Sequence, residues 1–384
     1  YMRKLVIVES PNKCETIKEI LGPSFIVMAS VGHISEIKNS GLYNMGIDPE
    51  NKFKADYVVS PDKKDVVSKL KEQVELADVV YIASDPDREG EAIAWSLKKF
   101  LKISNDKYQR VTFHEITKKA VLQAFENPRK IDDNLVSASQ ARQKLDKIVG
   151  YRLSPIAKKQ VDARSVGRVQ SAGLKLIVDR ENEISNFIIE NYFDLSLLFN
   201  KHDTDFKAKY FGTIEKEVKR LNTIEEVEDI VNDCKKTNTY KIDSIGTKEK
   251  YSNPKPPFTT STFQQEVSSK LGIGVKQAMS YAQKLFEGLD VDGKHIGLIT
   301  YIRSDSAEFS PDFLPILENH VKHTYGAKYY SAVRKAKKSE NAQEGHEAIR
   351  PVDLTMTPEG LANFIDDKNL LKVYDIIYKR TIAT

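Results

Sequence analysis

A run of acidic residues follows a short apolar segment in the first quarter of the chain. Asp85, Asp87 and Glu89 occupy alternate positions directly after residues 79–84, which we expect to form a buried strand. Ligand sites in open α/β sheets form at the carboxyl ends of strands, where these side chains would lie. Carboxylate oxygens suit Mg²⁺, and clustered carboxylates repel one another without a cation. We therefore favour a magnesium site over a solvated acidic turn, and Glu9, at the end of another apolar run, could join it.

A tyrosine in the apolar segment GLITYIRSDS (297–306) is followed two positions later by an arginine. Tyr301 and Arg303 lie on one face if a strand expected over 295–301 continues. A hydroxyl that attacks a phosphodiester needs nearby cations to stabilise the charge on phosphorus, and a guanidinium fits phosphate oxygens well. Because the chain has 17 tyrosines, most of them must be packing residues. The residues alone therefore leave open whether Tyr301 is a nucleophile or part of the core.

Two glycine turns each carry a basic residue that could approach a nucleic-acid strand. His33 ends the segment SVGH (30–33), and Arg168 lies in SVGRVQS (165–171) together with Gln170 and Ser171. Glycine allows close approach of the main chain, and most protein contacts to DNA go to its phosphates and sugars. Each turn by itself is a weak indication.

Three further side chains are open to two interpretations. His346 and Arg350, four positions apart in GHEAIRP (345–351), could bind phosphate or form a surface turn. Lys13, four positions after Glu9, could be a general acid or a phosphate contact, although a lone lysine at a helix start is more often solvated. The residues alone do not decide between these alternatives.

The composition excludes several classes of protein. The 384 residues are 40% hydrophobic, enough for a sizeable core, and no apolar run is long enough to span a bilayer. The two cysteines exclude a disulfide framework within this sequence and fit a reducing compartment. No P-loop motif is present, so no ATP site is visible, and we expect no signal peptide. The net charge of +4 is too small to identify nucleic-acid binding.

The elements that must position these side chains alternate between strand and helix in the first third of the chain. We expect strands over 4–9, 25–30, 79–84 and 110–114, and helices over 13–21, 91–101 and 118–126. This alternation predicts a mostly parallel sheet with helices on both faces. The remainder is expected to contain helices over 133–186, strands at 193–199, 206–210 and 240–245 around a charged helix at 224–236, a proline-rich hinge at 251–258, and mainly helices thereafter.

Taken together and in order, these segments resemble the type IA DNA topoisomerases, closest to the bacterial topoisomerase I branch. The resemblance covers nearly the whole chain and is carried by the following segments: VIVESPNKCETI (6–17), SVGHISEI (30–37), SDPDREGEAIAW (84–95), TFHEIT (112–117), ARQKLDKIVGYRLSP (141–155), SVGRVQSAGLKLIVDRE (165–181), PFTTSTFQQEVSSKLG (257–272), GLITYIRSDS (297–306) and EGHEAIRP (344–351). Single motifs of this kind are moderate evidence, whereas this series in the family's order is very specific.

The resemblance implies an α/β multidomain fold. A Rossmann-like Toprim domain would span 1–36 and 56–130, and a helical DNA-binding domain would span 37–55 and 131–191. A β-rich gate segment would follow over 192–256, then a catalytic tyrosine domain over 257–365 and the start of a return to the gate domain over 366–384. The DNA-binding domain and the gate would be incomplete, because relatives continue well past the position of Thr384.

The resemblance also assigns roles within the active site. Mg²⁺ would be held by Asp85, Asp87 and Glu89 with Glu9. Tyr301 would attack the DNA and become linked to a 5′ phosphate, and Arg303 with His346 would stabilise the scissile phosphate. Lys13 and Glu9 would serve the leaving 3′ hydroxyl. The residues expected to contact DNA are His33, Arg142, Arg168, Gln170, Ser171 and Arg350.

The function implied is ATP-independent relaxation of negatively supercoiled DNA through transient cleavage of one strand, strand passage and rejoining. Such a protein would act as a monomer on single-stranded segments of DNA, without a nucleotide cofactor or a membrane, in the cytoplasm and at the nucleoid if it is bacterial. Two alternatives stay open: another Toprim enzyme such as a primase or nuclease, and a non-catalytic fragment that binds single-stranded DNA. Asn12 and Cys14 depart from the small residues common at their positions in bacterial relatives, and His114 replaces an expected asparagine.

Overall fold

The computed structural model describes residues 2–213, 215–218, 220–237, 239–331, 333 and 347–384. The chain divides into two compact units, of which the first contains Tyr1–Arg168 and Asn253–Thr384 and the second contains Val169–Ser252. Each unit is described by itself. Within the described ranges, no helix combines the length and the apolar character needed to cross a membrane.

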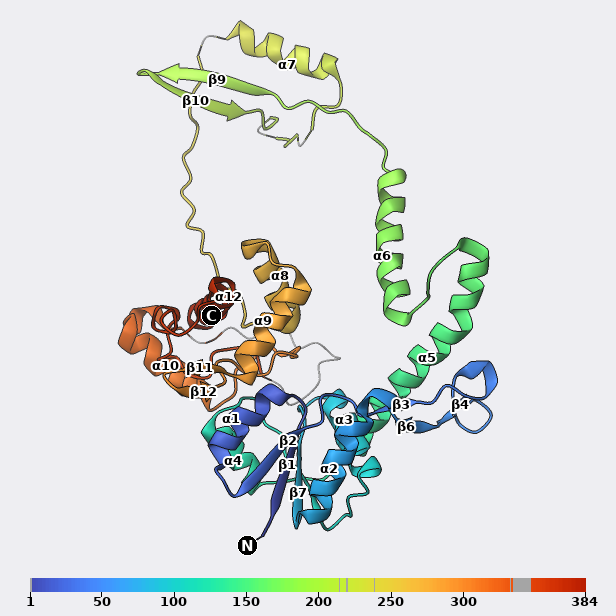
Figure 1. Cartoon of the computed structure of the whole chain (residues 1–384). Helices are drawn as coiled ribbons and strands as arrows, with labels where there is room; N and C mark the ends of the chain where they lie inside the picture. Colours follow the sequence, from blue (N-terminus) through green and yellow to red (C-terminus); the bar gives the residue numbers. More distant parts are fainter. Residues whose placement is uncertain (1, 214, 219, 238, 332, 334–346) are drawn as a thin grey trace. The chain divides into compact units, whose positions relative to one another are not determined.

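A four-stranded parallel sheet in the order β2-β1-β7-β8 forms the base of the first unit. Its strands are β1 (Lys4–Val8), β2 (Phe25–Ala29), β7 (Val79–Ala83) and β8 (Tyr108–Arg110). Its helices are α1 (Pro11–Leu21), α2 (Lys64–Leu76), α3 (Arg88–Phe100) and α4 (Lys118–Glu126). In Figure 1, α1 and α4 lie on one side of the sheet and α2 and α3 on the other, as the alternation of strands and helices predicts.

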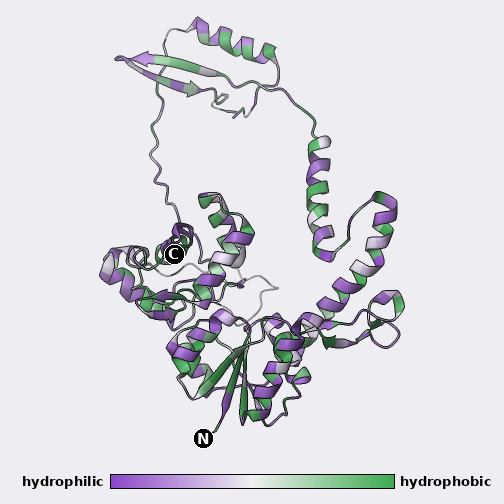
Figure 2. Ribbon diagram, viewed as in Figure 1, coloured by the Kyte–Doolittle hydropathy of each residue, from purple (hydrophilic) through white to green (hydrophobic). Residues whose placement is uncertain are grey.

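The sequence of β1 explains how the sheet is buried on both faces. Successive side chains of a strand point to opposite faces. Val6 and Val8 pack in the cluster that contains residues of α1 and α4, whereas Leu5 and Ile7 pack in the cluster with α2 and α3. Strands β2 and β7, and β1 after Lys4, are accordingly made mostly of apolar residues, and green predominates in these strands in Figure 2.

Two of the predicted elements whose ends differ from expectation lie next to the acidic motif or the Tyr301 segment. The last strand of the sheet ends at Arg110, so residues 111–114, expected to be strand, leave the sheet, and the main-chain oxygen of His114 accepts a hydrogen bond from the amide of Tyr301 at 2.7 Å. Helix α3 begins at Arg88 rather than at residue 91, because the carboxylate of Asp87 caps it by accepting from the amide of Gly90 at 2.7 Å. The acidic motif is therefore the turn that joins β7 to α3.

A small β region follows the first strands and packs against a long helix. Strand β3 (Ser35–Ile37) pairs with β6 (Tyr57–Val59), and β4 (Ile47–Asp48) pairs with β5 (Lys54–Ala55). Two short 3-10 helices are η1 (Leu42–Asn44) and η2 (Pro61–Lys63). Ile148 of α5 (Asp133–Val161) packs against the apolar cluster of this region.

The segment that carries Tyr301 shares a hydrophobic core with the α1 face of the sheet. Its elements are α8 (Thr260–Leu271), α9 (Val275–Glu287), β11 (Leu289–Val291), β12 (Lys294–Ile296), α10 (Phe313–Thr324), η3 (Ala327–Tyr329), α11 (Pro358–Leu361) and α12 (Lys368–Ala383). The strand expected over 295–301 ends at Ile296. A side chain at Gly297 would lie 2.8 Å from the main-chain oxygen of Phe286, and the chain from there runs irregularly to Tyr301.

The second unit contains α6 (Arg168–Ser185), the hairpin of β9 (Ser196–Lys201) and β10 (Thr204–Lys209), and α7 (Ile224–Lys236). The rings of Phe199 and Phe206 stack across the hairpin at 5.3 Å, and Tyr240 lies against Phe199. The strand expected over 240–245 does not form, and no strand within the described residues pairs with that segment.

Candidate active site

The carboxyl end of β7 is held in place by a buried arginine. Arg110 is fully buried, and its guanidinium donates to the main-chain oxygens of Ser84 at 2.8 Å and Asp85 at 2.9 Å. Its Nε donates to the buried carboxylate of Glu91 at 2.9 Å. Burial lowers the pKa of Arg110 to about 10, so the side chain stays charged near neutral pH. These hydrogen bonds from Arg110 hold the main chain of the acidic motif in place.

Glu9 directly follows β1, and Asp85 lies two positions after the end of the neighbouring strand β7. Lys13 of α1 forms a buried ion pair with Asp85. Burial raises the pKa of Glu9, the charge of Asp85 raises it further, and Lys13 offsets part of the effect. Lys13 is therefore a buried neighbour of the acidic motif rather than a solvated lysine.

Tyr301 meets the acidic motif directly. Its side chain is only 2% exposed, and its hydroxyl donates a hydrogen bond to Oδ2 of Asp87 at 2.8 Å. The guanidinium of Arg303 lies 3.3 Å from the same oxygen. Burial raises the pKa of Tyr301, and Asp85 and Asp87 raise it further, whereas Arg303 opposes them. The hydroxyl is therefore neutral in this arrangement, and any nucleophilic step must remove its proton.

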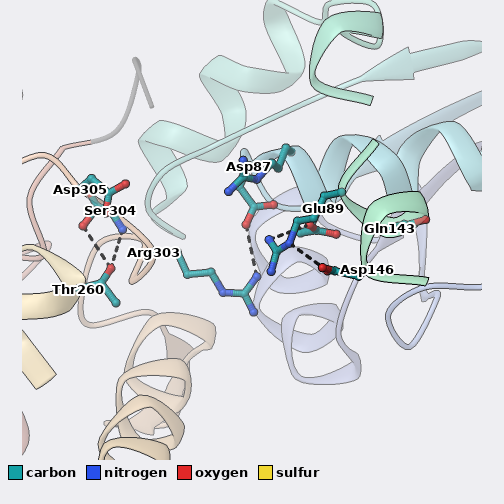
Figure 3. A pocket seen from close by; sticks show the side chains of 10 residues that line it. Asp87, Glu89, Gln143, Asp146, Thr260, Arg303, Ser304 and Asp305 are labelled. Atoms are coloured by element: carbon teal, nitrogen blue, oxygen red, sulfur yellow. Dashed lines mark hydrogen bonds and ion pairs between the residues drawn. The ribbon is translucent and has the colours of Figure 1, made fainter. Parts of the chain in front are cut away.

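An open pocket of about 710 Å³ lies beside this contact. The residues that line it are Asp87, Arg88, Glu89, Arg142, Gln143, Asp146, Thr260, Arg303, Ser304 and Asp305. Figure 3 shows Arg303 reaching across to Asp87, with Glu89 and Asp146 on the far wall. The pocket combines cations and hydrogen-bonding groups next to Tyr301, which suits a phosphodiester strand.

Glu89 is turned toward a different set of partners from Asp85. Ser139 donates to it at 3.2 Å, Arg142 lies at 3.4 Å, and Nε2 of His33 lies at 3.5 Å. The hydrogen bond from His33 lowers the pKa of Glu89 despite the opposing effect of burial. The structure therefore brings His33, Arg142 and Glu89 together on one wall of the site.

The remaining residues predicted to contact DNA or phosphate lie in different surroundings. Arg168 pairs with Asp146, a wall residue of the pocket, at 2.8 Å. Gln170 and Ser171 belong to the second unit and are exposed. His346, predicted to assist at the phosphate, lies outside the described residues.

The burial and the partners of Arg350 are not those expected of a residue that contacts phosphate. It is only 5% exposed, and its guanidinium binds Glu347 at 2.7 Å and Glu115 at 3.0 Å. These carboxylates occupy the donors that a phosphate would need, so the geometry does not support direct contact with DNA. These contacts, and the burial of Arg110 and Glu91, could not be predicted from the sequence, because the partners lie far away along the chain.

The carboxylates of the acidic motif have the donor chemistry of a Mg²⁺ site. Within the described ranges, no three histidine, cysteine, aspartate or glutamate side chains are arranged to hold a metal ion. Glu9, Asp85 and Asp87 nonetheless supply hard oxygens. Burial raises the pKa of Glu9, and the charges of Asp85 and Asp87 raise it further, an effect that a cation would oppose.

The chain is similar in sequence to known proteins. A family model described as DNA topoisomerase matches residues 130–384, and a model of the Toprim domain matches residues 4–116. The chain is 42% identical over 391 residues to DNA topoisomerase 1 of Rickettsia felis and to that of Rickettsia conorii, covering 99% of this chain and 50% of each relative. The chain thus spans about half the length of the curated relatives it matches.

A solved structure of full-length topoisomerase I from Thermotoga maritima is similar in fold. It is 35% identical, with a TM-score of 0.79, and the match covers 98% of this chain and 60% of that one. The Toprim match falls on the parallel sheet, which confirms the expected α/β fold class.

Proposed function

This chain belongs to the DNA topoisomerase family, and from that premise we propose that it is the catalytic part of an ATP-independent type IA enzyme. The observation that carries the proposal is the hydrogen bond of 2.8 Å from Tyr301 to Asp87. A tyrosine hydroxyl, an arginine and a cluster of carboxylates meet beside a pocket. This combination suits transfer of a phosphodiester to tyrosine more closely than the primase or nuclease alternatives, neither of which accounts for the tyrosine.

Cleavage exchanges one phosphodiester for another. The oxygen of Tyr301 attacks phosphorus, a bond to tyrosine forms, and the bond from phosphorus to the 3′ oxygen breaks. The proton of Tyr301 leaves through a neighbouring carboxylate or water, and the 3′ oxygen takes up a proton, for which Lys13 and Glu9 are the nearby candidates. Rejoining reverses these transfers, so the energy of the broken bond is retained and no ATP is consumed.

The charge that develops on phosphorus requires positive partners. Arg303 lies 3.3 Å from Asp87, at the edge of the pocket, where its planar guanidinium could move onto phosphate oxygens. Mg²⁺, held by Asp85 and Asp87 with Glu9 and Glu89, would add positive charge for the phosphate. His33, Arg142 and Arg168 would guide the strand, with Gln170 and Ser171 as further contacts.

The proposal includes strand passage, because the site is formed by two segments that are far apart in the sequence. Tyr301 and Asp87 lie 214 positions apart, and cleavage leaves one DNA end on each side of their contact. Separation of the Tyr301 segment from the sheet would open a gap for a second strand, and closure would allow rejoining. Relaxation of negatively supercoiled DNA, action as a monomer and a place in the bacterial cytoplasm at the nucleoid are further parts of this proposal.

A covalent-complex assay tests the proposal. The protein is incubated with Mg²⁺ and a single-stranded oligonucleotide labelled at its 3′ end, then denatured. We expect labelled DNA to remain attached to the parent protein and not to a Tyr301→Phe variant. Binding of the oligonucleotide without any adduct would instead support the non-catalytic single-strand-binding alternative.

A further inference from the structure

The end of helix α9 holds helix α1 at two points. Oε2 of Glu287 accepts a hydrogen bond from the side-chain amide of Asn12 at 2.9 Å. The main-chain oxygen of Glu287 accepts one from the hydroxyl of Thr16 at 3.0 Å. Asn12 lies in the first turn of α1, and Thr16 lies about one turn later. Two bonds from one residue restrain both the position and the rotation of α1 against α9.

The residue before Glu287 contacts both groups proposed for catalysis. The ammonium of Lys13 lies 5.1 Å from the centre of the Phe286 ring. The ring of Tyr301 also lies against the Phe286 ring, edge-on at 5.3 Å between centroids. Phe286 is fully buried, so this stack has little freedom. A shift of α1 against α9 would therefore displace Lys13 from its place opposite Tyr301.

Among the described residues, no ion pair joins the carboxylate of Glu287 to a cation. The side chain is only 4% exposed and lies at the carboxyl end of α9, where the helix dipole disfavours a negative charge. The hydrogen bonds described for its oxygens come from two neutral amides, that of Asn12 and that of Gln283 at 2.7 Å. A buried anion with only neutral donors gains hydration when it is exposed. Such a contact can align two elements and still break readily when they separate.

We propose that Glu287 is a positioning residue for DNA rejoining, because its bond with Asn12 sets the register between α1, which carries Lys13, and the segment that carries Tyr301. This inference rests on the proposed function. Opening breaks the bond between Asn12 and Glu287, and closing re-forms it before Lys13 faces the cleaved ends. Loss of the bond therefore slows rejoining more than it changes binding of the oligonucleotide.

Asn12→Asp is the variant that tests the bond between Asn12 and Glu287 most directly. It preserves the shape of the side chain but sets a second carboxylate against Glu287. An acidic residue in the first turn favours a helix, so α1 itself is not weakened. We expect the covalent complex to accumulate about fivefold and rejoining to slow correspondingly, within the range of coupling between contacting residues. The double variant with Glu287→Gln restores an amide–carboxylate bond with the roles exchanged, and parental rejoining is expected to return.

Gln283→Ala is the matched control. It also removes an amide from Glu287, but it lies on α9 itself and does not join α9 to α1. We expect its covalent complex to match that of the parent. An unchanged complex in Asn12→Asp, an equal rise in Gln283→Ala, or no recovery in the double variant would each overturn the inference.

Hydrogen–deuterium exchange without DNA separates failure of this inference from failure of the proposed function. A parent protein that forms no adduct contradicts the function, yet the pairing can still be judged from exchange in residues 11–21. Faster exchange in Asn12→Asp that reverses in the double variant supports the register role. Equal exchange in the parent, the single variants and the double variant overturns it.

Discussion

Arg350 and Glu115 form an ion pair at 3.0 Å although they lie 235 positions apart. Glu115 follows the last strand of the sheet, and the main-chain oxygen of Arg350 accepts a hydrogen bond from the amide of Thr300, next to Tyr301, at 2.9 Å. The guanidinium also lies 4.0 Å from the centre of the Phe313 ring. This pair ties the sheet to the tyrosine segment close to the active site.

Replacement of Arg350 by alanine is expected to lower the free energy of unfolding by about 2–4 kcal/mol, because Glu115 and Glu347 lose their cation while largely shielded from water. Urea denaturation measures the loss. Arg350→Lys should lose less, since it keeps the charge. If the alanine variant instead kept full stability and lost affinity for single-stranded DNA, Arg350 would be the DNA contact that the sequence suggested.

Replacement of Arg110 by methionine is expected to cost about 3–5 kcal/mol, because it leaves Glu91 short of a partner and the oxygens of Ser84 and Asp85 without a donor. Thermal unfolding measures the effect. Adding Glu91→Leu should recover part of the stability by removing the buried charge. A single variant as stable as the parent would show that the arginine does not hold the acidic motif in place.

Replacement of Gly90 by alanine is expected to destabilise the protein by about 1–3 kcal/mol and to abolish the covalent complex, because the new methyl group would lie 2.0 Å from the main-chain oxygen of Asp85. The matched control is Gly173→Ala in α6, where no atom lies within 4 Å of the added group. The control should be neutral or slightly stabilising, since alanine is the better helix former. Parental adduct formation by Gly90→Ala would contradict the close packing of the turn.

Acid should weaken the contact between α8 and α12 through Glu266. Burial opposes ionisation, but hydrogen bonding by Lys270 and the charge of Arg380 lower the pKa of Glu266 below its usual 4.5 in the folded state. A lowered pKa adds stability that is present above pH 4.5 and is lost as the pH falls through the folded value. Glu266→Gln should therefore be less stable than the parent at pH 7, and the difference should shrink below pH 4.5. Denaturation curves across this range check the prediction, and a difference independent of pH would refute it.

The parallel sheet and the place of the acidic motif could be predicted from local features of the sequence. Apolar β-branched residues at 79–83 and the turn that follows are local signals, and a strand of a parallel sheet is buried on both faces whatever packs against it. The order of the motifs likewise indicated the family. The ends of elements were less predictable: residues 240–245 have the alternation of a strand, but pairing needs a neighbour that the described part of the chain does not supply there.

Contacts between side chains that are distant in the sequence follow only from the fold. The spacing of Tyr301 and Asp87 in the sequence carries no information about a bond of 2.8 Å, and the prediction that they meet came from resemblance. The partners of Arg350 could not be predicted either, because an arginine that binds phosphate and one buried against carboxylates can have the same local sequence. Glu115 approaches it only through the fold, and that approach is what gives the arginine its role.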